Sequence, residues 1–328
     1  MPLRVIDSIA IRGLLPMSKC IDLMRSAMIA TSSGYVNLPV RSVAPVLNKT
    51  GLLAQMPGSS NELKHYGIKL LSLHSANTTK ALPAIQGLVV MFEAETGIPV
   101  AILEAAQITA IRTAAASGLA TQLLSREDAK TCGIFGNGVQ AVSHIEAIKA
   151  VRPIEKVVVW GRNAEKTEAF TKEQQESVDC EVIATSDPTE AAQCDVVCTV
   201  TASKESILNG SWVKPGAHIN LVGAHSLNSR EADSELVANS LIYVDSMEST
   251  LKEGGDIMIP VEEGVICESD IKGEIGKLLT GDVAGRERDE QITLYKSHGI
   301  FTQDLYAADY VLARAKDVNA GTFIDDFN

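Results

Sequence analysis

Two glycines and an alanine, spaced as in a phosphate-binding loop, are the first residues that indicate chemistry. The stretch KTCGIFGNGVQAV, residues 130–142, contains the pattern Gly136-x-Gly138-x-x-Ala141. Gly136 permits a tight turn, Gly138 lets the backbone approach a pyrophosphate, and Ala141 lets a helix pack closely on the preceding strand. The N-terminus of that helix would offer free N–H groups to the phosphates. Because a strand-like run precedes the pattern and a helix-like run follows it, we predict a dinucleotide-binding loop rather than an ordinary turn.

The residues after the next strand favour NADPH as the cofactor. A fold that is specific for NAD places Asp or Glu there, about 20 residues beyond the glycines, to bind a ribose 2′-OH. This chain reads Trp160-Gly161-Arg162-Asn163 at that point, and Lys166 follows one turn later. The guanidinium of Arg162 suits a 2′-phosphate. We therefore expect NADPH to be preferred and NADH to be possible. In the alternative interpretation, Arg162 is a solvated arginine and both cofactors are accepted.

Arg41 and Arg112 are basic residues within otherwise apolar segments, in LPVRSV and AIRTAA. An α-amino or α-imino acid has a carboxylate next to its reacting carbon, and a planar guanidinium can bind that carboxylate with two parallel hydrogen bonds. Half-buried arginines need an anionic partner. An internal salt bridge to Glu93 or Glu104 would satisfy the same need, so the residues alone leave both interpretations open.

Lys69 lies in HYGIKLLSL with apolar neighbours on either side. A lysine beside two arginines in a closed cleft should have a lowered pKa. Such a lysine could donate a proton or a hydrogen bond to a substrate nitrogen or carboxylate. The alternative is a lysine on an edge strand whose ammonium group reaches solvent, and the sequence by itself favours that alternative.

From residue 130 onward, strand-like and helix-like segments alternate. The expected strands are TCGIFG, KVVVWG, CEVIAT, DVVCTVT, AHINLVG and SLIYVDS, and amphipathic helices lie between the first of them. The strands are continuous apolar runs, as burial on both faces of a parallel sheet requires. This order predicts an α/β fold with a Rossmann-type doubly wound sheet.

The first 125 residues predict a separate α+β domain. QGLVVMFEAETGIPVAILEA is expected to form an antiparallel hairpin that turns at Glu95-Thr96-Gly97. YVNLPVRSVAPVL and HYGIKLLSL are also strand-like, and AAQITAIRTAAASGLATQLLS has high helix propensity. The late amphipathic helix in SHGIFTQDLYAADYVLARAK is expected to return to this domain. We predict one domain from residues 1–125 with 300–328, and a Rossmann domain from residues 126–299.

Composition excludes several classes of partner. The 328 residues carry a net charge of −12 without a Lys/Arg-rich run, so neither a nucleic-acid nor an anionic-membrane partner is expected. No apolar run approaches the roughly 20 residues of a membrane span, and MPLRVIDSIA does not resemble a signal peptide. The six cysteines form no C-x-x-C pair and are expected to be reduced and buried. We expect a cytoplasmic protein, and the histidine spacing predicts no metal site.

Several segments in this order resemble the ornithine cyclodeaminase/μ-crystallin family. They are GIKLLSLHSAN, ALPAIQGLVVMFEAETGIPVAILEAAQITAIRTAAASGLAT, GIFGNGVQA and SHGIFTQDLYAA. The T-x-x-R-T-A-A-x-S pattern is highly specific, and the resemblance covers nearly the whole chain. It implies a homodimer with an N-terminal domain for substrate binding and dimerisation, and a Rossmann domain that holds NAD(H) or NADP(H).

The resemblance also assigns roles to individual residues. It implies that Arg41 and Arg112 bind a substrate carboxylate and that Lys69 is the active-site lysine. Met56 is assigned to the same substrate site. The residues assigned to the cofactor site are Gly136, Gly138, Val139, Ala141, Arg162, Thr201 and Val222.

His225 is where the chain departs from part of this family. Cyclodeaminases and alanine dehydrogenases of the family carry a catalytic Asp after the fifth Rossmann strand, whereas this chain reads LVGAHSLN with His225 in that place. An imidazole could protonate an imine nitrogen as a general acid, but it poorly replaces a carboxylate that activates water. The alternative for His225 is a loop residue that only lines the pocket.

Together these residues predict an oxidoreductase that uses NAD(P)H to reduce a cyclic α-imino acid. The substrate is expected to be Δ1-pyrroline-2-carboxylate and/or Δ1-piperideine-2-carboxylate, which gives L-proline or L-pipecolate, and the proton is expected from Lys69, His225 or water. The first alternative is an ornithine cyclodeaminase or an alanine dehydrogenase. The second is a crystallin-like, NADPH-dependent small-molecule binding protein.

Overall fold

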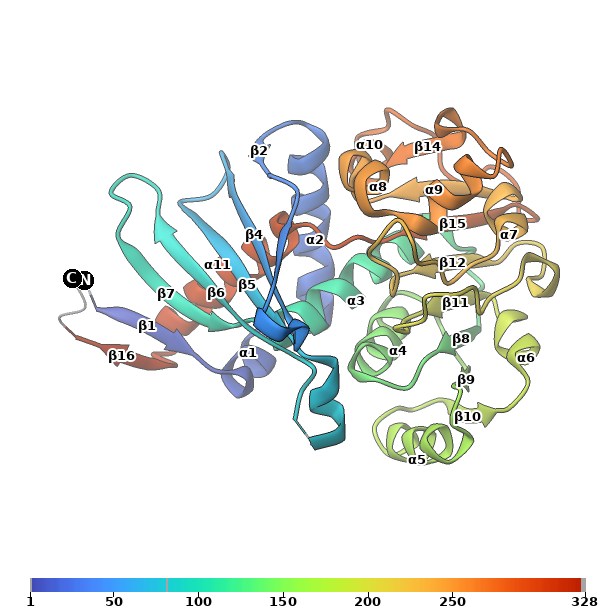
Figure 1. The fold of residues 1–328 in the computed structure, drawn as a ribbon, viewed down its shortest axis with the longest axis horizontal. Helices are drawn as coiled ribbons and strands as arrows, with labels where there is room; N and C mark the ends of the chain where they lie inside the picture. The colour runs from blue at the N-terminus through green and yellow to red at the C-terminus, as the bar shows by residue number, and fades with distance from the viewer. Residues whose placement is uncertain (1, 81, 326–328) are drawn as a thin grey trace. The chain divides into compact units, whose positions relative to one another are not determined.

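The computed structural model describes residues 2–80 and 82–325 and divides into two compact units (Figure 1). Unit 1 comprises Met1–Arg112 and Ile300–Asn328, and unit 2 comprises Thr113–Gly299. The first boundary follows Arg112, whereas the sequence predicts it after residue 125. The difference arises because the C-terminal half of helix α3 is bonded to unit 2, where Ser117 Oγ lies 3.0 Å from His144 Nε2 and Asn220 Nδ2 donates to Thr121 Oγ1.

Unit 1 is built on an eight-stranded mixed sheet in the order β16-β1-β7-β6-β5-β4-β2, with β3 paired to β4. Its strands are β1 Leu3–Ile6, β2 Val36–Asn37, β3 Ser42–Pro45, β4 Leu52–Ser60, β5 His65–Leu73, β6 Ile85–Glu93, β7 Pro99–Glu104 and β16 Thr322–Ile324. The hairpin predicted around Gly97 is confirmed as β6 and β7, and Gly97 has a φ of 73°. Strand β4 was not predicted, because Pro57 and Gly58 in its second half disfavour a strand.

Helices cover one face of this sheet. They are α1 Ser8–Leu14, α2 Met17–Ser32, the first part of α3 Ala105–Leu124, and α11 Phe301–Asp317, with short 3-10 turns at Leu47–Lys49 and Ser75–Lys80. Helix α11 packs against α2, β4 and β5. Alternating residues of the strands are buried, among them Met56, Lys69 and Val89, which occupy neighbouring positions on β4, β5 and β6. The sheet therefore directs Lys69 into the protein interior.

Unit 2 contains an all-parallel sheet in the order β10-β9-β8-β11-β12-β15-β13-β14. Its strands are β8 Thr131–Phe135, β9 Lys156–Trp160, β10 Glu181–Thr185, β11 Val196–Thr199, β12 His218–Leu221, β13 Ser240–Val244, β14 Ile271–Glu274 and β15 Ile292–Lys296. The strand order reverses between β8 and β11, as in a doubly wound fold. The Rossmann-type prediction and its six strands are confirmed, whereas β14 and β15 were not predicted.

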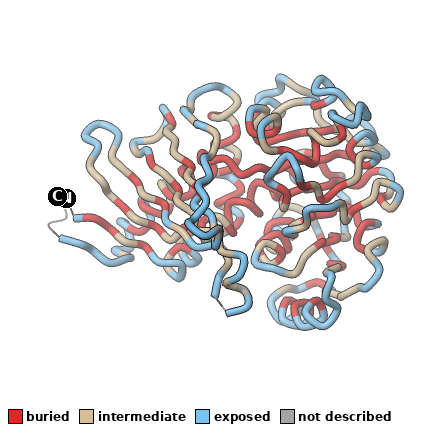
Figure 2. The backbone as a smooth tube through the Cα atoms, viewed as in Figure 1, coloured by how far each residue is buried: buried red, intermediate tan, exposed pale blue. Residues whose placement is uncertain are grey.

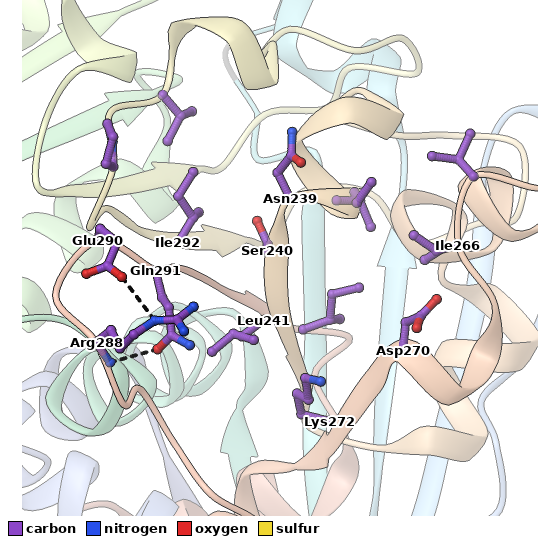
Figure 3. A pocket seen from close by; sticks show the side chains of 16 residues that line it. Asn239, Ser240, Leu241, Ile266, Asp270, Lys272, Arg288, Glu290, Gln291 and Ile292 are labelled. Carbon is purple, nitrogen blue, oxygen red and sulfur yellow. Dashed lines mark hydrogen bonds and ion pairs between the residues drawn. The ribbon is translucent and has the colours of Figure 1, made fainter.

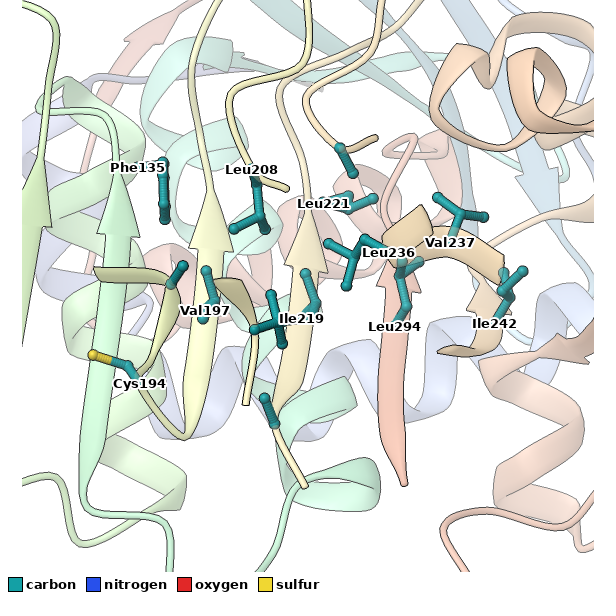
Figure 4. Packing of buried hydrophobic residues seen from close by; sticks show 14 of the residues in the cluster. Phe135, Cys194, Val197, Leu208, Ile219, Leu221, Leu236, Val237, Ile242 and Leu294 are labelled. Carbon is teal, nitrogen blue, oxygen red and sulfur yellow. The ribbon is translucent and has the colours of Figure 1, made fainter. Parts of the chain in front are cut away.

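Buried apolar residues fill both faces of the unit 2 sheet (Figures 2 and 4). In Figure 4, Val197, Ile219 and Leu294 come from three adjacent strands and pack near Leu208 and Leu236. The helices of the unit are α4 Val139–Val151, α5 Ala164–Gln175, α6 Pro188–Ala192, α7 Ser234–Ala238, α8 Met247–Glu253, α9 Gly255–Glu262 and α10 Ile275–Thr280, with 3-10 turns at Gly210–Trp212 and Glu268–Asp270.

All six cysteines are free thiols, and five of them are buried. Cys267 is exposed, which corrects the expectation for that residue, because it caps a short surface turn instead of lying in a strand. Among the described residues, none of the helices has the length and apolarity needed to cross a membrane.

Candidate active site

The glycine pattern lies at a strand–turn–helix junction in unit 2. Strand β8 ends at Phe135, Gly136 has a φ of 119°, and Gly138 caps α4. A Cβ atom on Gly136 would lie 3.0 Å from the carbonyl oxygen of Val200, whereas a Cβ on Gly138 would meet nothing within 4 Å. Gly138 therefore leaves open space at the N-terminus of the helix, which is the space that a pyrophosphate needs. The two other predicted cofactor residues of this loop differ in burial, since Val139 is exposed and Ala141 is buried.

The end of the second strand carries an exposed arginine. Arg162 follows β9, and Asn163 caps α5 by accepting a hydrogen bond from the backbone N–H of Lys166 at 2.8 Å. Asn137, in the glycine loop, donates to Thr167 Oγ1 at 3.1 Å and so ties the loop to the start of α5. The turn between Trp160 and Asn163 contains no carboxylate, and its one charged side chain is the guanidinium.

Thr201, Val222 and His225 follow the carboxyl ends of β11 and β12. Val222 is buried and donates its N–H to Thr199 O at 3.0 Å. Thr201 donates its N–H and its hydroxyl to Glu231, at 2.8 and 2.6 Å. His225 is exposed in the turn after β12. These residues share the sheet edge at which doubly wound folds bind nucleotides.

Three charged side chains meet in the interior of unit 1. Lys69 and Asp304 are 0% exposed and Arg112 is 4% exposed. Lys69 Nζ donates to Asp304 Oδ2 at 2.7 Å, and Arg112 Nε donates to Asp304 Oδ1 at 3.0 Å. Arg112 Nη1 also donates to Gln303 Oε1 at 2.7 Å. Gln303 and Asp304, in the first turn of α11, therefore accept hydrogen bonds from the two cationic side chains.

The interpretation of Lys69 as a lysine that reaches solvent is wrong. Strand β5 lies between β4 and β6, and the whole side chain is buried. The carboxylate that pairs with Arg112 belongs to Asp304. It is neither Glu93 nor Glu104, the two partners considered from the sequence. Glu93 accepts hydrogen bonds within the hairpin turn from Thr96, and Glu104 caps α3 by accepting from the N–H groups of Ala106 and Gln107.

Gln303 and Asp304 belong to the cluster but were not among the residues predicted from the sequence. Both lie in SHGIFTQDLYAA, a segment already noted for its resemblance. An acidic residue in the first turn of an amphipathic helix is ordinary, because it complements the helix dipole. The one signal in the sequence was that Asp304 would be placed on the apolar side of that helix, where a carboxylate needs a cationic partner.

The pKa of Lys69 is lowered from 10.5 to about 7, first by burial and then by the positive charge of Arg112, against the opposing effect of Asp304. Arg41, which is half-buried just before β3, contributes a smaller lowering. The predicted direction of this shift is confirmed. Near neutral pH, Lys69 can therefore exchange a proton readily.

The cluster has more positive than negative charge when Lys69 is protonated. Two buried cations then share the carboxylate of Asp304. Among the described residues, Nη2 of Arg112 has no hydrogen-bond partner, since its bonds use Nε and Nη1. Because the two buried cations share the carboxylate of Asp304 and uncompensated buried charge is costly, this group of residues is suited to bind an organic anion.

Protonation of Lys69 should make folding stability depend on pH. Its pKa of about 7 in the folded protein lies below the ordinary value of 10.5, so between these values the unfolded chain binds more protons than the folded one. Stability then rises with pH across this window, by up to about 1.4 kcal/mol per pH unit, and the destabilisation is greatest at and below pH 7. We expect the Lys69→Met variant to lack this rise. Urea unfolding near pH 7 and near pH 9 measures it, and identical pH dependence in the two proteins would contradict the lowered pKa.

A cavity of about 560 Å³ lies elsewhere in unit 2 (Figure 3). It is lined at the amino ends of β13 and β15, where Ser240 and Ile292 begin these strands, and by Asp270 and Lys272 near β14. It therefore lies at the sheet edge opposite the glycine loop and contains none of the predicted site residues. Among the described residues, no three His, Cys, Asp or Glu side chains are grouped as metal ligands would be.

Known proteins resemble the chain over nearly its full length. The model of the ornithine cyclodeaminase/mu-crystallin family matches residues 4–319. A Delta(1)-pyrroline-2-carboxylate reductase of Bacillus cereus is 34% identical over 316 residues, which cover 96% of this chain and 97% of that protein. The ketimine reductase mu-crystallin of Mus musculus is 38% identical over 279 residues, 85% of each chain. A solved structure of Thermococcus litoralis Delta(1)-pyrroline-2-carboxylate reductase in complex with NADH and L-proline has a TM-score of 0.95 and 34% identity, and covers 98% of this chain and 100% of that chain.

Proposed function

Because the chain belongs to the ornithine cyclodeaminase/mu-crystallin family, we propose that it uses NAD(P)H to reduce a cyclic α-imino acid. The substrate is Δ1-pyrroline-2-carboxylate and/or Δ1-piperideine-2-carboxylate, and the product is L-proline or L-pipecolate. The observation that carries the proposal is the buried cluster of Lys69, Arg112 and Asp304, whose surplus positive charge suits a carboxylate ligand. The relatives named above as reductases of such imines, and the one bound to NADH and L-proline, support the same reaction.

The residues of unit 1 would bind and orient the substrate. Arg112 presents Nη2 to the carboxylate while Asp304 and Gln303 fix its guanidinium, and Arg41 supplies a second cation. Met56, opposite Lys69 in the β4–β5 pair, contributes an apolar wall. Fixing the carboxylate fixes the adjacent C=N carbon, and such positioning provides much of the rate in two-substrate reactions.

Proton transfer would complete the reduction. The bound nicotinamide supplies the hydride, which adds to the imine carbon, and the ring nitrogen takes up one proton to become the secondary amine. Protonated Lys69 is our first candidate for the donor, because its pKa of about 7 matches neutral conditions. His225, in the exposed turn after β12, is the second candidate, and water is the third.

The glycine loop fits a dinucleotide. The open space at Gly138, the free N-terminus of α4 and the carboxyl-end position of Thr201 and Val222 would serve the pyrophosphate and the nicotinamide half. Both reduced cofactors are compatible with this loop, and we propose NADPH as the preferred one because of Arg162.

The Arg162→Ala variant tests this preference. Loss of one charge-assisted contact to the 2′-phosphate should raise KM for NADPH about tenfold, which corresponds to about 1.4 kcal/mol, and leave KM for NADH within about twofold. Lys172→Ala, which removes another exposed cation from the same region, is the matched control. Equal effects on both cofactors, or none on either, would reject the role of Arg162.

Two other functions remain as alternatives to test. An ornithine cyclodeaminase or alanine dehydrogenase needs a carboxylate near the substrate ammonium, and His225 occupies the expected place. Asp304 is a poor replacement because Lys69 and Arg112 already occupy both of its oxygens. A crystallin-like binding protein would hold NADPH and a ligand without turnover.

One assay distinguishes these functions. NADPH and NADH oxidation is followed with a panel of cyclic imino acids, and ornithine and L-alanine are tested with the oxidised cofactors in the same run. We expect rapid oxidation with the five- or six-membered imino acid. Ammonia release from ornithine without net redox change, or tight ligand binding without turnover, would replace the proposal with one of the two alternatives.

We also propose a homodimer in a cytoplasmic location. Exposed apolar side chains gather on the strands of unit 1, at Val43 on β3, Leu52 and Leu53 on β4, and Ile85 and Leu88 on β6. Apolar patches of this kind usually mark an interface. The buried, unpaired thiols agree with a reducing compartment.

A further inference from the structure

Unit 2 contains a buried acidic residue that the proposed reaction does not use. Glu231 is 0% exposed and its carboxylate joins the ends of β11 and β12. Oε2 accepts from Thr199 Oγ1 at 2.7 Å and from the N–H of Gly223 at 2.6 Å, and Oε1 accepts from both the N–H and the hydroxyl of Thr201. One side chain thus fixes the residues that follow two adjacent strands.

Asp256 and Lys296 contact the same segment. Asp256 Oδ1 accepts from the backbone N–H groups of Glu231 and Ala232, at 2.6 and 3.2 Å. Lys296 Nζ lies 2.8 Å from Asp256 Oδ2 and donates to Ala224 O at 2.6 Å. Both charged side chains are 0% exposed. Three of these contacts end on the segment from residue 223 to residue 232, at Ala224, Glu231 and Ala232, and the fourth joins Asp256 to Lys296.

Two glycines show how tightly this segment is packed. A Cβ on Gly255 would lie 2.2 Å from Ser229 O and 2.5 Å from Ser226 O, and a Cβ on Gly223 would lie 2.0 Å from Thr201 O. Backbone therefore packs directly on backbone at both ends of the turn that carries His225. A turn that must only close a surface loop does not require such contacts.

We propose that Glu231, Asp256 and Lys296 act as a clamp that positions residues 222–225 for the nicotinamide half of the cofactor. The reversal of strand order between β8 and β11 places the ends of β11 and β12 on the second mononucleotide half of a doubly wound fold. The clamp consequently fixes the N–H of Gly223, which follows Val222, and the carbonyl of Ala224, which precedes His225. These three residues are positioning residues, and their role rests on the proposed use of a nicotinamide cofactor.

The charges themselves indicate a positioning role. Burial of an ionic group costs several kcal/mol, and apolar residues of similar volume often hold a turn equally well. Here seven hydrogen bonds connect the three side chains to Thr199, to Thr201 and to the segment 223–232. Hydrogen bonds with fixed directions set backbone positions more narrowly than apolar packing does, which is what a site for hydride transfer requires.

The Glu231→Gln variant is the sharpest test. The amide keeps the size of the side chain, but its NH2 group faces N–H and O–H donors and cannot accept from them. Glu235→Gln, an exposed glutamate four positions later on α7, is the matched control. Two ligands are titrated by fluorescence or calorimetry, namely the reduced cofactor and the corresponding adenine nucleotide without nicotinamide (2′,5′-ADP or ADP).

We expect Glu231→Gln to weaken binding of the reduced cofactor about tenfold and to leave the adenine nucleotide within about twofold of wild type, because the clamp fixes residues proposed to serve only the nicotinamide half of the cofactor. With an imino acid present, kcat should fall about tenfold to a hundredfold, and Glu231→Asp should recover less than the full activity but more than Glu231→Gln. Equal weakening of both nucleotides would indicate general loss of structure and overturn the proposal, as would unchanged binding of both.

Two further variants keep the test decisive if Glu231→Gln does not fold. Lys296→Met removes the contact to Ala224, and Gly255→Ala pushes against Ser226 and Ser229. Whichever variant folds, by circular dichroism, must show the same selective loss of cofactor affinity. The binding ratio needs no imino acid, so a wild-type protein that fails to reduce any imine would reject the proposed function and still decide the role of the clamp.

Discussion

The Arg112→Lys enzyme is expected to lose about a hundredfold in kcat/KM for the imino acid and to bind NADPH as tightly as the wild type. A hundredfold loss corresponds to about 2.7 kcal/mol of transition-state stabilisation. Lysine retains the charge but lacks the planar fork that can bind Asp304, Gln303 and a ligand carboxylate together. The loss should therefore appear although net charge is unchanged.

Steady-state kinetics with the imino acid and direct titration of the cofactor measure this effect. Arg314→Lys is the matched control, because Arg314 is an exposed arginine of α11 that pairs with Asp317. Activity of Arg112→Lys within about threefold of wild type would reject Arg112 as a carboxylate-binding residue. Equal loss of cofactor binding would instead indicate that the substitution disturbs more than the anion site.

The Asp304→Asn variant should be about 3–5 kcal/mol less stable than the wild type, because it leaves Lys69 and Arg112 buried without a carboxylate. Asparagine has nearly the same shape, so loss of packing contributes little. The loss of stability should be smaller above pH 7, because a larger fraction of Lys69 is then neutral. The Lys69→Met/Asp304→Asn double variant should recover part of the loss, since it removes one of the uncompensated cations.

Urea unfolding near pH 7 gives these free energies. Asp309→Asn is the control, because Asp309 lies on the same helix and pairs with the partly exposed His65, and it should cost no more than about 1 kcal/mol. If Asp304→Asn cost as little as Asp309→Asn, the buried ion pairs would not be the main interaction between α11 and the sheet of unit 1.

The parts of the fold that were predictable are those whose signal is local. Strands such as β8 and β9 are continuous apolar runs, and the glycine loop after β8 has a fixed spacing. Strand β15 has no such signal, since its sequence ITLYK ends in a lysine that reads as solvent-exposed. Lys296 is buried where Asp256, on α9, pairs with it and the carbonyl of Ala224 accepts its hydrogen bond. Such a strand could be recognised only by knowing that Asp256 pairs with its lysine, and this pairing cannot be read from the sequence.

The same reason limited prediction of the site. Lys69 and Arg112 could be singled out because each is a cation within an apolar segment. The residue that joins them, Asp304, lies 235 positions from Lys69 and 192 positions from Arg112. The lowered pKa of Lys69 and an anionic partner for Arg112 were therefore predictable from the sequence, whereas the identity of that partner was not. Glu93 and Glu104 were nearer in sequence, yet each already caps a local turn or helix.

The most direct measurement compares two substrates that differ only in the carboxylate. NADPH oxidation is followed with Δ1-pyrroline-2-carboxylate and with Δ1-pyrroline, in the wild type and in Arg112→Lys. A site built around the carboxylate should favour the acid by on the order of 10³-fold in the wild type, and the preference should shrink at least tenfold in the variant. Equal turnover of the two imines by the wild type, or an unchanged preference in the variant, would contradict the claim that the cations of unit 1 select the substrate through its carboxylate.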